Sequence, residues 1–427
     1  MVSPARRLSF KLLCQIDSRR LFSDDALNSA DIEGLEIRDR HLTTEIVYGT
    51  LRWQGLLDYL LAGVSSRPWQ EVERGARILL RMSIYQMWQM DRIPDHALVN
   101  DAVELAKRDL GKGIDRYLNG ILRHLARARP WTKNEFPYDA PAWVQRSLPQ
   151  WLWERWSSRY GESVAAEFAD SLNRPPAAAF RLGVDDPDKL AFKAVRSDLV
   201  PGAAVRISGH SQQDRSYRYQ DEASQLIPHL LGSATGWRIW DACAAPGGKT
   251  AVLSGLCGNS GQVVASDLRK ERILRVAERL KASGKVGAHL LVADVSKPVP
   301  FRCGFDAVLV DVPCSGLGTL RRNPEIKWHF NPADFAPLQR IQKRIIDSVS
   351  GAVRVGGRLL YSTCSTEPED NEQVVDFFLK NHPDFSLERP VSPPGIENWT
   401  GPDQMVRTFP SARLWDGFFA ALMVRRS

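Results

Sequence analysis

Apolar positions in the first third of the chain follow the spacing of amphipathic helices. A Ser3-Pro4 pair of the kind that starts a helix is followed by apolar residues every three or four positions, at Ala5, Leu8, Leu12 and Ile16. The same spacing predicts further helices over residues 40–61, 72–90, 96–110 and 115–128. Residues 1–135 are therefore expected to form an all-helical domain.

Beyond residue 237 the pattern changes, and short apolar runs alternate with helical patterns. The runs predict strands at residues 237–240, 263–266, 289–293, 305–310 and 358–361. The stretches between them predict helices over residues 270–283, 333–353 and 371–380. Because such alternation is typical of a doubly wound, mostly parallel sheet, we expect an α/β domain over residues 221–427.

Two less regular stretches lie between these domains. Residues 130–141 contain Pro137 and Asp139 without a periodic pattern and are interpreted as a linker. Residues 142–220 begin with a group of tryptophans, and a strand is predicted at 179–184. An amphipathic helix is predicted around Phe168. We expect this stretch to form a smaller unit that precedes the α/β domain.

Composition and charge narrow the class of protein. The net charge of +7 favours a polyanionic partner. A basic cluster in the last part of the helical domain is interpreted as an RNA contact, although any single member would suit an ordinary solvated surface. The cluster comprises Lys107, Arg108, Lys112, Arg116, Arg123, Arg127 and Arg129.

Other sequence features exclude some classes of protein. No apolar run reaches membrane-spanning length, so we expect a cytoplasmic protein without a membrane partner. The six cysteines form no C-x-x-C pair and the eight histidines form no H-E-x-x-H pattern. Neither a metal site nor a disulfide framework is therefore expected.

Residues 241–249 read Asp-Ala-Cys-Ala-Ala-Pro-Gly-Gly-Lys and connect a predicted strand to a predicted helix. Gly247 and Gly248 let the backbone approach a ligand closely, and the helix after them directs free N–H groups towards it. The spacing differs from the G-x-x-x-x-G-K-[ST] and G-x-G-x-x-G loops. The turn predicts a cofactor site, although a tight turn packed with small residues would have a similar sequence.

Polar residues follow the next strands at the edge where such sheets bind ligands. Asp267 ends the second strand, where a carboxylate can bind both ribose hydroxyls, and Asp294 follows the third, within reach of an adenine. These positions predict a cofactor that carries an adenosine. Each aspartate would also suit a helix cap.

The fourth strand leads into Asp311 and Cys314, and the fifth into Cys364. Neighbouring strands lie about 4.8 Å apart, so if these two are adjacent, both thiols and the carboxylate face one pocket. A buried free cysteine is usually an inert apolar side chain, but these two lie beyond strand ends among polar residues. Because a free thiol has a pKa of about 8.5, the pocket must activate it.

With these residues assembled, the chain resembles the bacterial ribosomal RNA cytosine-C5 methyltransferases of the RsmB (Sun/Fmu) type. The resemblance covers nearly the whole chain and rests on residues 241–249 and on Asp-Val-Pro-Cys-Ser-Gly-Leu-Gly at 311–318, which continues to Trp328. It also rests on Ser-Thr-Cys-Ser at 362–365, followed by Pro-Glu-Asp-Asn-Glu at 368–372. Asp-Gly-Phe-Phe at 416–419 also fits the family.

The resemblance implies a three-part architecture. Residues 1–135 would form an all-α, NusB-like RNA-binding domain, and residues 142–220 a small α/β, RRM-like subdomain. Residues 221–427 would form a Rossmann-like, class I S-adenosylmethionine-dependent methyltransferase domain. The implied enzyme is a monomeric 16S rRNA (cytosine-C5)-methyltransferase.

The resemblance also implies roles for individual residues. Cys364 would be the nucleophile that adds to C6 of cytosine, Cys314 would assist product release, and Asp311 would stabilise charge on the ring. S-adenosylmethionine would be bound by Cys243, Ala244, Ala245, Pro246, Gly247, Gly248, Lys249, Asp267, Arg272, Asp294 and Asp311. Phosphates around a single-stranded or flipped-out cytosine of 16S ribosomal RNA would be held by Arg321, Arg322 and Lys327.

Three alternatives remain at this point. The roles of the two cysteines could be exchanged, as in DNA cytosine methyltransferases. The same chemistry could act on transfer RNA or on another ribosomal position. The chain could instead be a non-catalytic RNA-binding or ribosome-assembly factor, but such a factor would not need to retain every reactive group.

Overall fold

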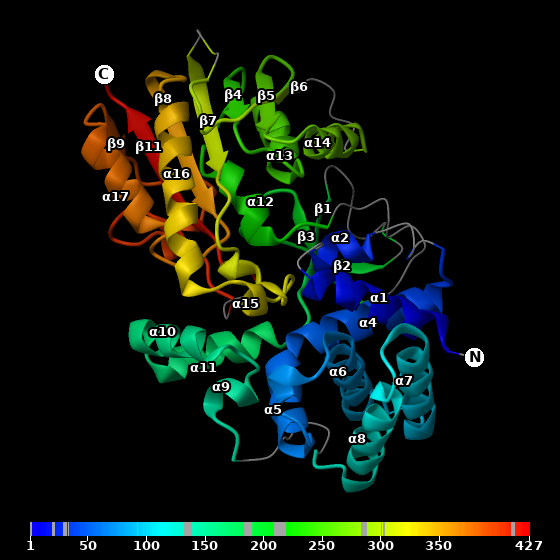
Figure 1. Cartoon of the computed structure of the whole chain (residues 1–427). Coiled ribbons are helices and arrows are strands. Elements are labelled where there is room, and N and C mark those ends of the chain that lie inside the picture. Colours follow the sequence, from blue (N-terminus) through cyan, green and yellow to red (C-terminus); the bar gives the residue numbers. More distant parts are fainter. Residues whose placement is uncertain are drawn as a thin grey trace. The chain divides into compact units, whose positions relative to one another are not determined.

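The computed structural model describes residues 2–18, 22–28, 32, 34–91, 93–131, 139–182, 190, 192–208, 219–282, 288–299, 301, 304–410 and 415–427. Contacts between residues divide the chain into two units (Figure 1). Unit 1 comprises Met1–Pro175 and Leu320–His329, and unit 2 comprises Pro176–Thr319 and Phe330–Ser427.

Unit 1 begins with the predicted helical domain. Its larger helices are α1 (Pro4–Asp17), α4 (Ile37–Arg52), α5 (Gln54–Val64), α6 (Arg74–Gln89), α7 (Asp95–Asp109) and α8 (Ile114–Ala128), with the shorter α2 (Ser23–Leu27) and η1 (Trp69–Glu71) between them. The prediction of an all-helical region is confirmed. The single helix expected over residues 40–61 is wrong, because the chain breaks at Trp53, which ends α4 and precedes α5.

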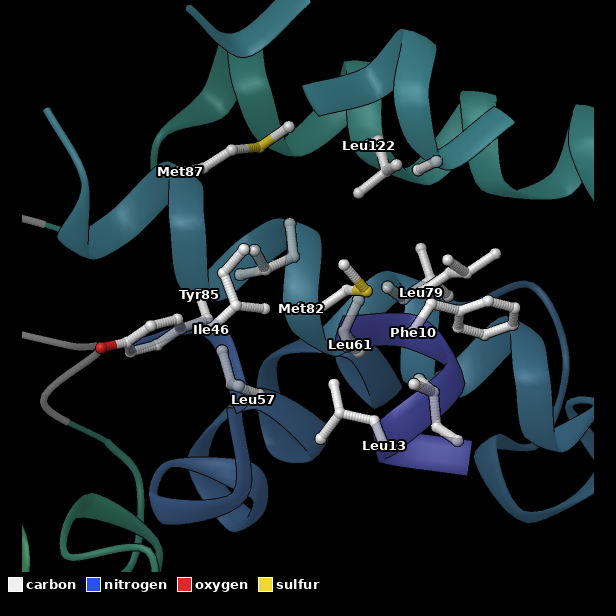
Figure 2. Packing of buried hydrophobic residues seen from close by; sticks show 14 of the residues in the cluster. Phe10, Leu13, Ile46, Leu57, Leu61, Leu79, Met82, Tyr85, Met87 and Leu122 are labelled. Atoms are coloured by element: carbon white, nitrogen blue, oxygen red, sulfur yellow. The ribbon is translucent and has the colours of Figure 1, made fainter. Parts of the chain in front are cut away.

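The core of unit 1 is built around α6, most of whose residues are buried. Figure 2 shows Leu79 and Met82 of this helix among apolar side chains of other helices, including Phe10, Ile46 and Leu122. Because these side chains recur at helical spacing, their burial explains why the pattern in the sequence was so clear.

The contacts divide the chain elsewhere than at the predicted domain borders. Helices α9 (Ala142–Gln145), α10 (Gln150–Tyr160) and α11 (Glu162–Leu172) belong to unit 1. Val144 of α9 and Trp131 lie in the same apolar core as the helices before them. Most of the predicted linker, residues 132–138, lies outside the described residues.

A three-stranded antiparallel sheet opens unit 2. Its strands are β1 (Ala178–Arg181), β2 (Lys193–Arg196) and β3 (Ala203–Ser208), in the order β1-β3-β2. Strand β1 confirms the start of the strand predicted at 179–184, of which residues 183–184 lie outside the described residues. The other two strands were not predicted.

The main sheet of unit 2 contains the five predicted parallel strands. They are β4 (Arg238–Asp241), β5 (Gln262–Asp267), β6 (Ala288–Val292), β7 (Phe305–Asp311) and β8 (Val353–Thr363), in the order β8-β7-β4-β5-β6. Three strands not expected from the sequence extend the sheet antiparallel beyond β8: β9 (Phe385–Leu387), β10 (Val406–Arg407) and β11 (Phe419–Arg425).

Helices cover both faces of this sheet, as the doubly wound prediction requires (Figure 1). Helices α12 (Glu222–His229) and α13 (Gly248–Cys257) share an apolar core with Ile239, whereas α16 (Phe335–Ser350) and α17 (Glu372–Asn381) share one with Trp240. Helix α14 (Lys270–Ala282) contributes Val276 to a smaller cluster. In such sheets ligands bind beyond the carboxyl ends of the strands, where the candidate residues of this chain lie.

Among the described residues, no helix combines the length and the apolar character that crossing a membrane requires.

Candidate active site

The turn between β4 and α13 is tightly packed at its two glycines. Gly247 has a φ of +96°, and a Cβ atom there would lie 3.0 Å from the Cα atom of Val276. At Gly248 a Cβ atom would lie 2.8 Å from Oε1 of Gln220. The backbone N–H of Ala244 donates to the carbonyl of Ser266 at the end of β5, with N···O 2.8 Å. The turn is thus fixed against β5, and only glycine fits its second half without displacement.

Three carboxylates gather around this turn, from Asp241, Asp267 and Asp311. Burial raises the pKa of Asp241 to about 7, and the charges of Asp311 and Asp267 add to the effect. The hydroxyl of Thr250 donates to Oδ2 of Asp241 at 2.7 Å. Burial, followed by the same three carboxylates, also raises the pKa of Cys243, which keeps that thiol protonated and unsuited to nucleophilic attack.

Asp267 lies at the end of β5 with only 4% of its surface exposed. Its Oδ2 atom accepts a hydrogen bond from the backbone N–H of Ala245 at 3.3 Å and lies 3.5 Å from Nη1 of Arg272. The other guanidinium nitrogen of Arg272 donates to the carbonyl of Ala245 at 3.3 Å. Arg272 therefore contacts both the turn and Asp267 and holds their relative positions.

Asp294 lies two residues beyond the end of β6. Its Oδ1 atom accepts from the backbone N–H and the hydroxyl of Ser296, at 3.1 and 2.6 Å. These bonds hold the pKa of Asp294 below its usual value, the hydroxyl of Ser296 contributing most. The carboxylate is held in a local turn at the edge of the sheet where an adenine was expected.

Lys249 and Asp311 form an ion pair at the carboxyl end of the sheet. The Nζ atom of Lys249 lies 2.7 Å from Oδ2 of Asp311, and the hydroxyl of Ser362 donates to Oδ1 at 2.7 Å. The ring of Phe418 lies 4.9 Å from the lysine nitrogen. The sequence analysis assigned no role to Ser362 or Phe418, although both lie in the stretches that carried the family resemblance.

The two candidate cysteines are in contact. Strands β7 and β8 are parallel neighbours, with Asp311 opposite Ser362, which confirms the adjacency that the prediction required. The Sγ atoms of Cys314 and Cys364 are 3.4 Å apart. The hydrogen bond with Cys364 raises the pKa of Cys314, followed by burial. The raised pKa favours the protonated form of Cys314.

A second set of glycines fixes the loop of Cys364. The backbone N–H of Gly318 donates to the carbonyl of Cys364 at 3.0 Å, and the N–H of Gly417 donates to the carbonyl of Gly318 at 2.8 Å. A Cβ atom on Gly318 would lie 1.9 Å from the carbonyl oxygen of Gly417. The Gly-Leu-Gly and Asp-Gly-Phe-Phe sequences thus meet directly behind the cysteine.

The residues at the turn suit the expected cofactor. Among the described residues, the buried Oδ1 atom of Asp241 and Oε1 of Gln220 have no hydrogen-bond partner, so two acceptors at this site are free. The surrounding carboxylates favour a positively charged ligand. S-adenosylmethionine carries a sulfonium and an ammonium group. Both are positively charged, and the ammonium group can donate hydrogen bonds to the free acceptors.

The structure corrects the expectation that Arg321 and Lys327 bind RNA phosphates. Both belong to unit 1, and only 1% of each is exposed. Arg321 donates through Nε to the carbonyl of Ser171 at 3.0 Å, and Lys327 donates through Nζ to the carbonyl of Arg52 at 2.7 Å. Burial lowers the pKa of Lys327 well below its usual value. Both cations thus donate to backbone carbonyls inside unit 1. Of the three residues expected to bind phosphates, only Arg322 is half-buried and not fully buried.

The stretch that carries these residues is anchored in unit 1 by further contacts. The buried carboxylate of Glu325 accepts from the backbone N–H and the hydroxyl of Ser23, at 3.0 and 2.8 Å. Trp328 of α15 (Ile326–His329) donates through Nε1 to the carbonyl of Leu51 at 2.8 Å. We call residues 320–329 the anchored segment. Spacing in the sequence gave no sign that it packs among the N-terminal helices.

The basic cluster of the helical domain is exposed, as an RNA contact requires. Some of its members pair with neighbouring acids, such as Lys107 with Glu104 at 2.8 Å and Arg129 with Asp95 at 2.6 Å. Unit 1 also contains an open cavity of about 900 Å³, whose lining includes apolar side chains such as Leu8 and Phe10. The cations around it are Arg7, Lys11, Arg74 and Arg108.

Within the described residues, no group of three or more His, Cys, Asp and Glu side chains could hold a metal ion.

Comparisons with known proteins found matches over nearly the whole chain. A family model described as 16S rRNA methyltransferase RsmB/F matches residues 228–424, and the NusB family model matches residues 3–127. Probable ribosomal RNA small subunit methyltransferase B of Bacillus subtilis is 33% identical, over 99% of this chain and 98% of the relative. The protein of the same name from Synechocystis is 31% identical, over 98% of each chain.

Solved structures share the fold. The crystal structure of PH0851 has a TM-score of 0.80 at 24% identity and covers 100% of this chain and 99% of its own. A methyltransferase homolog protein from Pyrococcus horikoshii has a TM-score of 0.58 at 25% identity, over 66% of this chain and 97% of its own.

The fold and the site define an S-adenosylmethionine-dependent methyltransferase. In its sequence a NusB-like helical domain precedes a Rossmann-like domain. The match to both family models and to relatives over nearly the whole length identifies it further. The chain belongs to the RsmB/F family of rRNA methyltransferases.

Proposed function

We propose that this protein transfers a methyl group from S-adenosylmethionine to C5 of a cytosine in 16S ribosomal RNA. The observation that carries the chemistry is the contact between Cys314 and Cys364, with Sγ atoms 3.4 Å apart at the carboxyl end of the sheet. Two thiols beside an aspartate suit an aromatic carbon that is too weak a nucleophile to be methylated directly. The names of the relatives favour the small ribosomal subunit RNA as substrate.

In the proposed mechanism, Cys364 is the nucleophile. Its Sγ forms a bond to C6, and the electrons of the C5–C6 double bond make C5 nucleophilic. S-adenosylmethionine supplies an electrophilic methyl group on its sulfonium sulfur. The raised pKa of Cys314 makes that thiol the poorer nucleophile, which favours Cys364 for this role.

Asp311 would stabilise charge on the ring. Each of its oxygens already accepts one hydrogen bond, from Lys249 or Ser362, and keeps a second lone pair for donors on the cytosine edge. After methyl transfer the C5 proton leaves to a base in the pocket, the C5–C6 double bond re-forms and the bond to Cys364 breaks. Cys314 would assist this elimination by protonating the departing sulfur.

The cofactor would be held by the turn from Cys243 to Lys249, with Ala244, Ala245, Pro246, Gly247 and Gly248 between them. Asp267, braced by Arg272, would bind the ribose, Asp294 the adenine, and Asp241 the positive end of the methionine part. The target cytosine would have to leave its stack to reach Cys364, which favours single-stranded or flipped-out RNA. With ribosomal RNA as substrate, the protein would act in the cytoplasm as a monomer.

The test measures methyl transfer from labelled S-adenosylmethionine to unmodified 16S ribosomal RNA and, separately, to unmodified transfer RNA. We expect 5-methylcytosine in the 16S RNA with the wild type and none with Cys364→Ala. Label in transfer RNA alone would keep the chemistry and overturn the substrate. Cofactor binding without transfer to either RNA would favour a non-catalytic assembly factor instead.

The same assay separates the roles of the two cysteines. With Cys314→Ala, we expect a covalent RNA–protein adduct to accumulate on denaturing gels, because release is impaired. With Cys364→Ala, no adduct should form. The reverse pattern would assign the nucleophile to Cys314.

A further inference from the structure

A buried carboxylate lies directly behind the two cysteine loops and has no part in the proposed reaction steps. Asp370 is 0% exposed. Its Oδ2 atom accepts from the backbone N–H of Ser315 at 3.2 Å and from the hydroxyl of Ser315 at 2.6 Å. Its Oδ1 atom accepts from Nε2 of Gln342 at 2.6 Å. Since Ser315 follows Cys314, Asp370 fixes the backbone next to one of the reacting sulfurs.

The hydroxyl of Ser315 continues the connection to the other cysteine loop. It lies 3.0 Å from the hydroxyl of Ser365, which follows Cys364. Asn371, the neighbour of Asp370, donates through Nδ2 to the carbonyl of Ser365 at 2.9 Å and accepts through Oδ1 from Thr363 at 2.5 Å. Consecutive residues of one loop thus hold the positions on both sides of Cys364 and the position after Cys314.

We propose that Asp370 is a positioning residue for methyl transfer, which sets the contact between Cys314 and Cys364 by holding Ser315. The proposal rests on the proposed function for the roles of the two cysteines. Among the residues that the structure describes, no cation pairs with the Asp370 carboxylate, so hydrogen bonds alone stabilise its charge, which is a costly way to hold a loop. This cost is explained if Asp370 has two effects on the thiol pair: its hydrogen bonds position Ser315, and its negative charge acts on Cys314.

The charge of Asp370 acts on the same sulfur. It contributes to the raised pKa of Cys314, after the hydrogen bond with Cys364, burial and the charge of Cys364. A negative charge near Cys314 disfavours its thiolate and leaves the proton on that sulfur. Asp370 therefore favours the protonated form of Cys314, which suits the proposed role of that thiol in protonating the departing sulfur.

The experiment compares Asp370→Asn with the wild type in the full-length chain. Asp376→Asn is the matched control, because Asp376 is an exposed aspartate on α17. The first readout is the rate at which diamide forms the Cys314–Cys364 disulfide, followed by peptide mapping. In this reaction the two thiols lose two protons and two electrons, which diamide takes up, so the rate reports how often the sulfurs meet without any need for RNA.

The second readout is the pH at which iodoacetamide alkylates Cys314. For Asp370→Asn we expect disulfide formation to slow at least tenfold and the midpoint of Cys314 alkylation to fall, because a nearby negative charge is gone. Single-turnover methyl transfer should fall at least tenfold, with the affinity for S-adenosylmethionine within twofold of the wild type. Unchanged disulfide formation together with an unchanged midpoint would overturn the proposal.

A second variant covers the case in which Asp370→Asn does not fold. Ser315→Ala keeps the carboxylate and its bond from Gln342 but removes the hydroxyl between the loops. Ser315→Ala should slow disulfide formation. It should also shift the pH midpoint of Cys314 alkylation, but by less than Asp370→Asn does, because the negative charge remains. If the two thiol readouts change as expected while even the wild type methylates no RNA, the proposed function fails and the positioning of the thiols by Asp370 stands.

Discussion

The ammonium nitrogen of Lys249 lies 2.7 Å from a carboxylate oxygen of Asp311, so the cofactor turn and the end of β7 share one ion pair. The side chains are 10% and 27% exposed, and water can do little to replace a missing partner. The pair links the expected methyl donor site to the residue expected to hold the cytosine.

Replacing Lys249 by Met should disturb both sites. The Asp311 carboxylate would keep only the bond from Ser362, and the free energy of unfolding should fall by about 2 kcal/mol because a mostly buried charge loses its partner. Urea unfolding and calorimetric titration with S-adenosylmethionine measure the two effects, and the affinity should fall at least tenfold. Lys380→Met, at an exposed position of α17, should change neither quantity. Wild-type affinity in Lys249→Met would contradict a role for the pair in cofactor binding.

The affinity for S-adenosylmethionine should depend on pH through Asp241. Its pKa in the free protein is raised to about 7, chiefly by burial, so the carboxyl is neutral below this pH and negative above it. A positively charged cofactor favours the negative form, and the affinity should therefore rise as the pH increases from about 6 to 8. Equilibrium titration at several pH values measures this rise. Asp241→Asn should remove most of it, and an equally steep rise in that variant would exclude Asp241 as its source.

The same pKa shift has the opposite effect on the stability of the free protein. The folded chain holds the proton of Asp241 more tightly than the unfolded chain, whose value is near 3.8. Asp241 therefore contributes stability that is present at low pH and is lost as the pH rises towards about 7.

Alanine at position 318 should misplace the loop of Cys364. The added Cβ would lie 1.9 Å from the carbonyl oxygen of Gly417, which is backbone and cannot rotate away. We expect Gly318→Ala to lower the free energy of unfolding by about 3 kcal/mol and to slow diamide oxidation of Cys364. Gly351→Ala is the control, because no described atom outside its own helix turn and chain neighbours lies within 4 Å of its Cβ position. Equal stability of the two variants in urea unfolding would show that the loops can move apart freely.

The salt dependence of RNA binding should separate surface cations from buried ones. Lys327→Met should leave the slope of log affinity against log salt unchanged, because the Lys327 ammonium donates to the Arg52 carbonyl inside unit 1. Arg123→Gln with Arg127→Gln, on the exposed face of α8, should reduce that slope by about two, one for each phosphate contact. Filter binding to 16S RNA fragments from low to moderate salt measures it. A reduced slope for Lys327→Met would restore its original assignment as a phosphate contact.

Much of the α/β fold could be predicted because its signals are local. The five parallel strands are short apolar runs, and the turn after β4 has a glycine at each position where a Cβ atom would meet Val276 or Gln220. The adjacency of β7 and β8, which brings Cys314 and Cys364 together, was a condition of the prediction, and only the structure shows that it is met. The antiparallel strand β11 was missed, because a strand buried on both faces at the end of a chain has no alternation to mark it.

The site was less completely predictable, because burial is a property of the whole fold. Arg321 and Lys327 stand in a basic stretch close to Cys314, and nothing in their spacing distinguishes a buried cation from one that binds phosphate. Asp370 had the converse problem. Its sequence was part of the family resemblance, but its role follows only from the hydrogen bonds that converge on it across two loops.

The anchored segment limits which parts of this protein can be exchanged for others. Its first residue follows Cys314 by only six positions, yet its buried Glu325 and Lys327 depend on Ser23 and the Arg52 carbonyl near the other end of the sequence. Exchanging the helical part for another RNA-binding module, by gene fusion or by engineering, would leave both charges without partners. The two parts must therefore be inherited and altered together, although each matches a family model of its own.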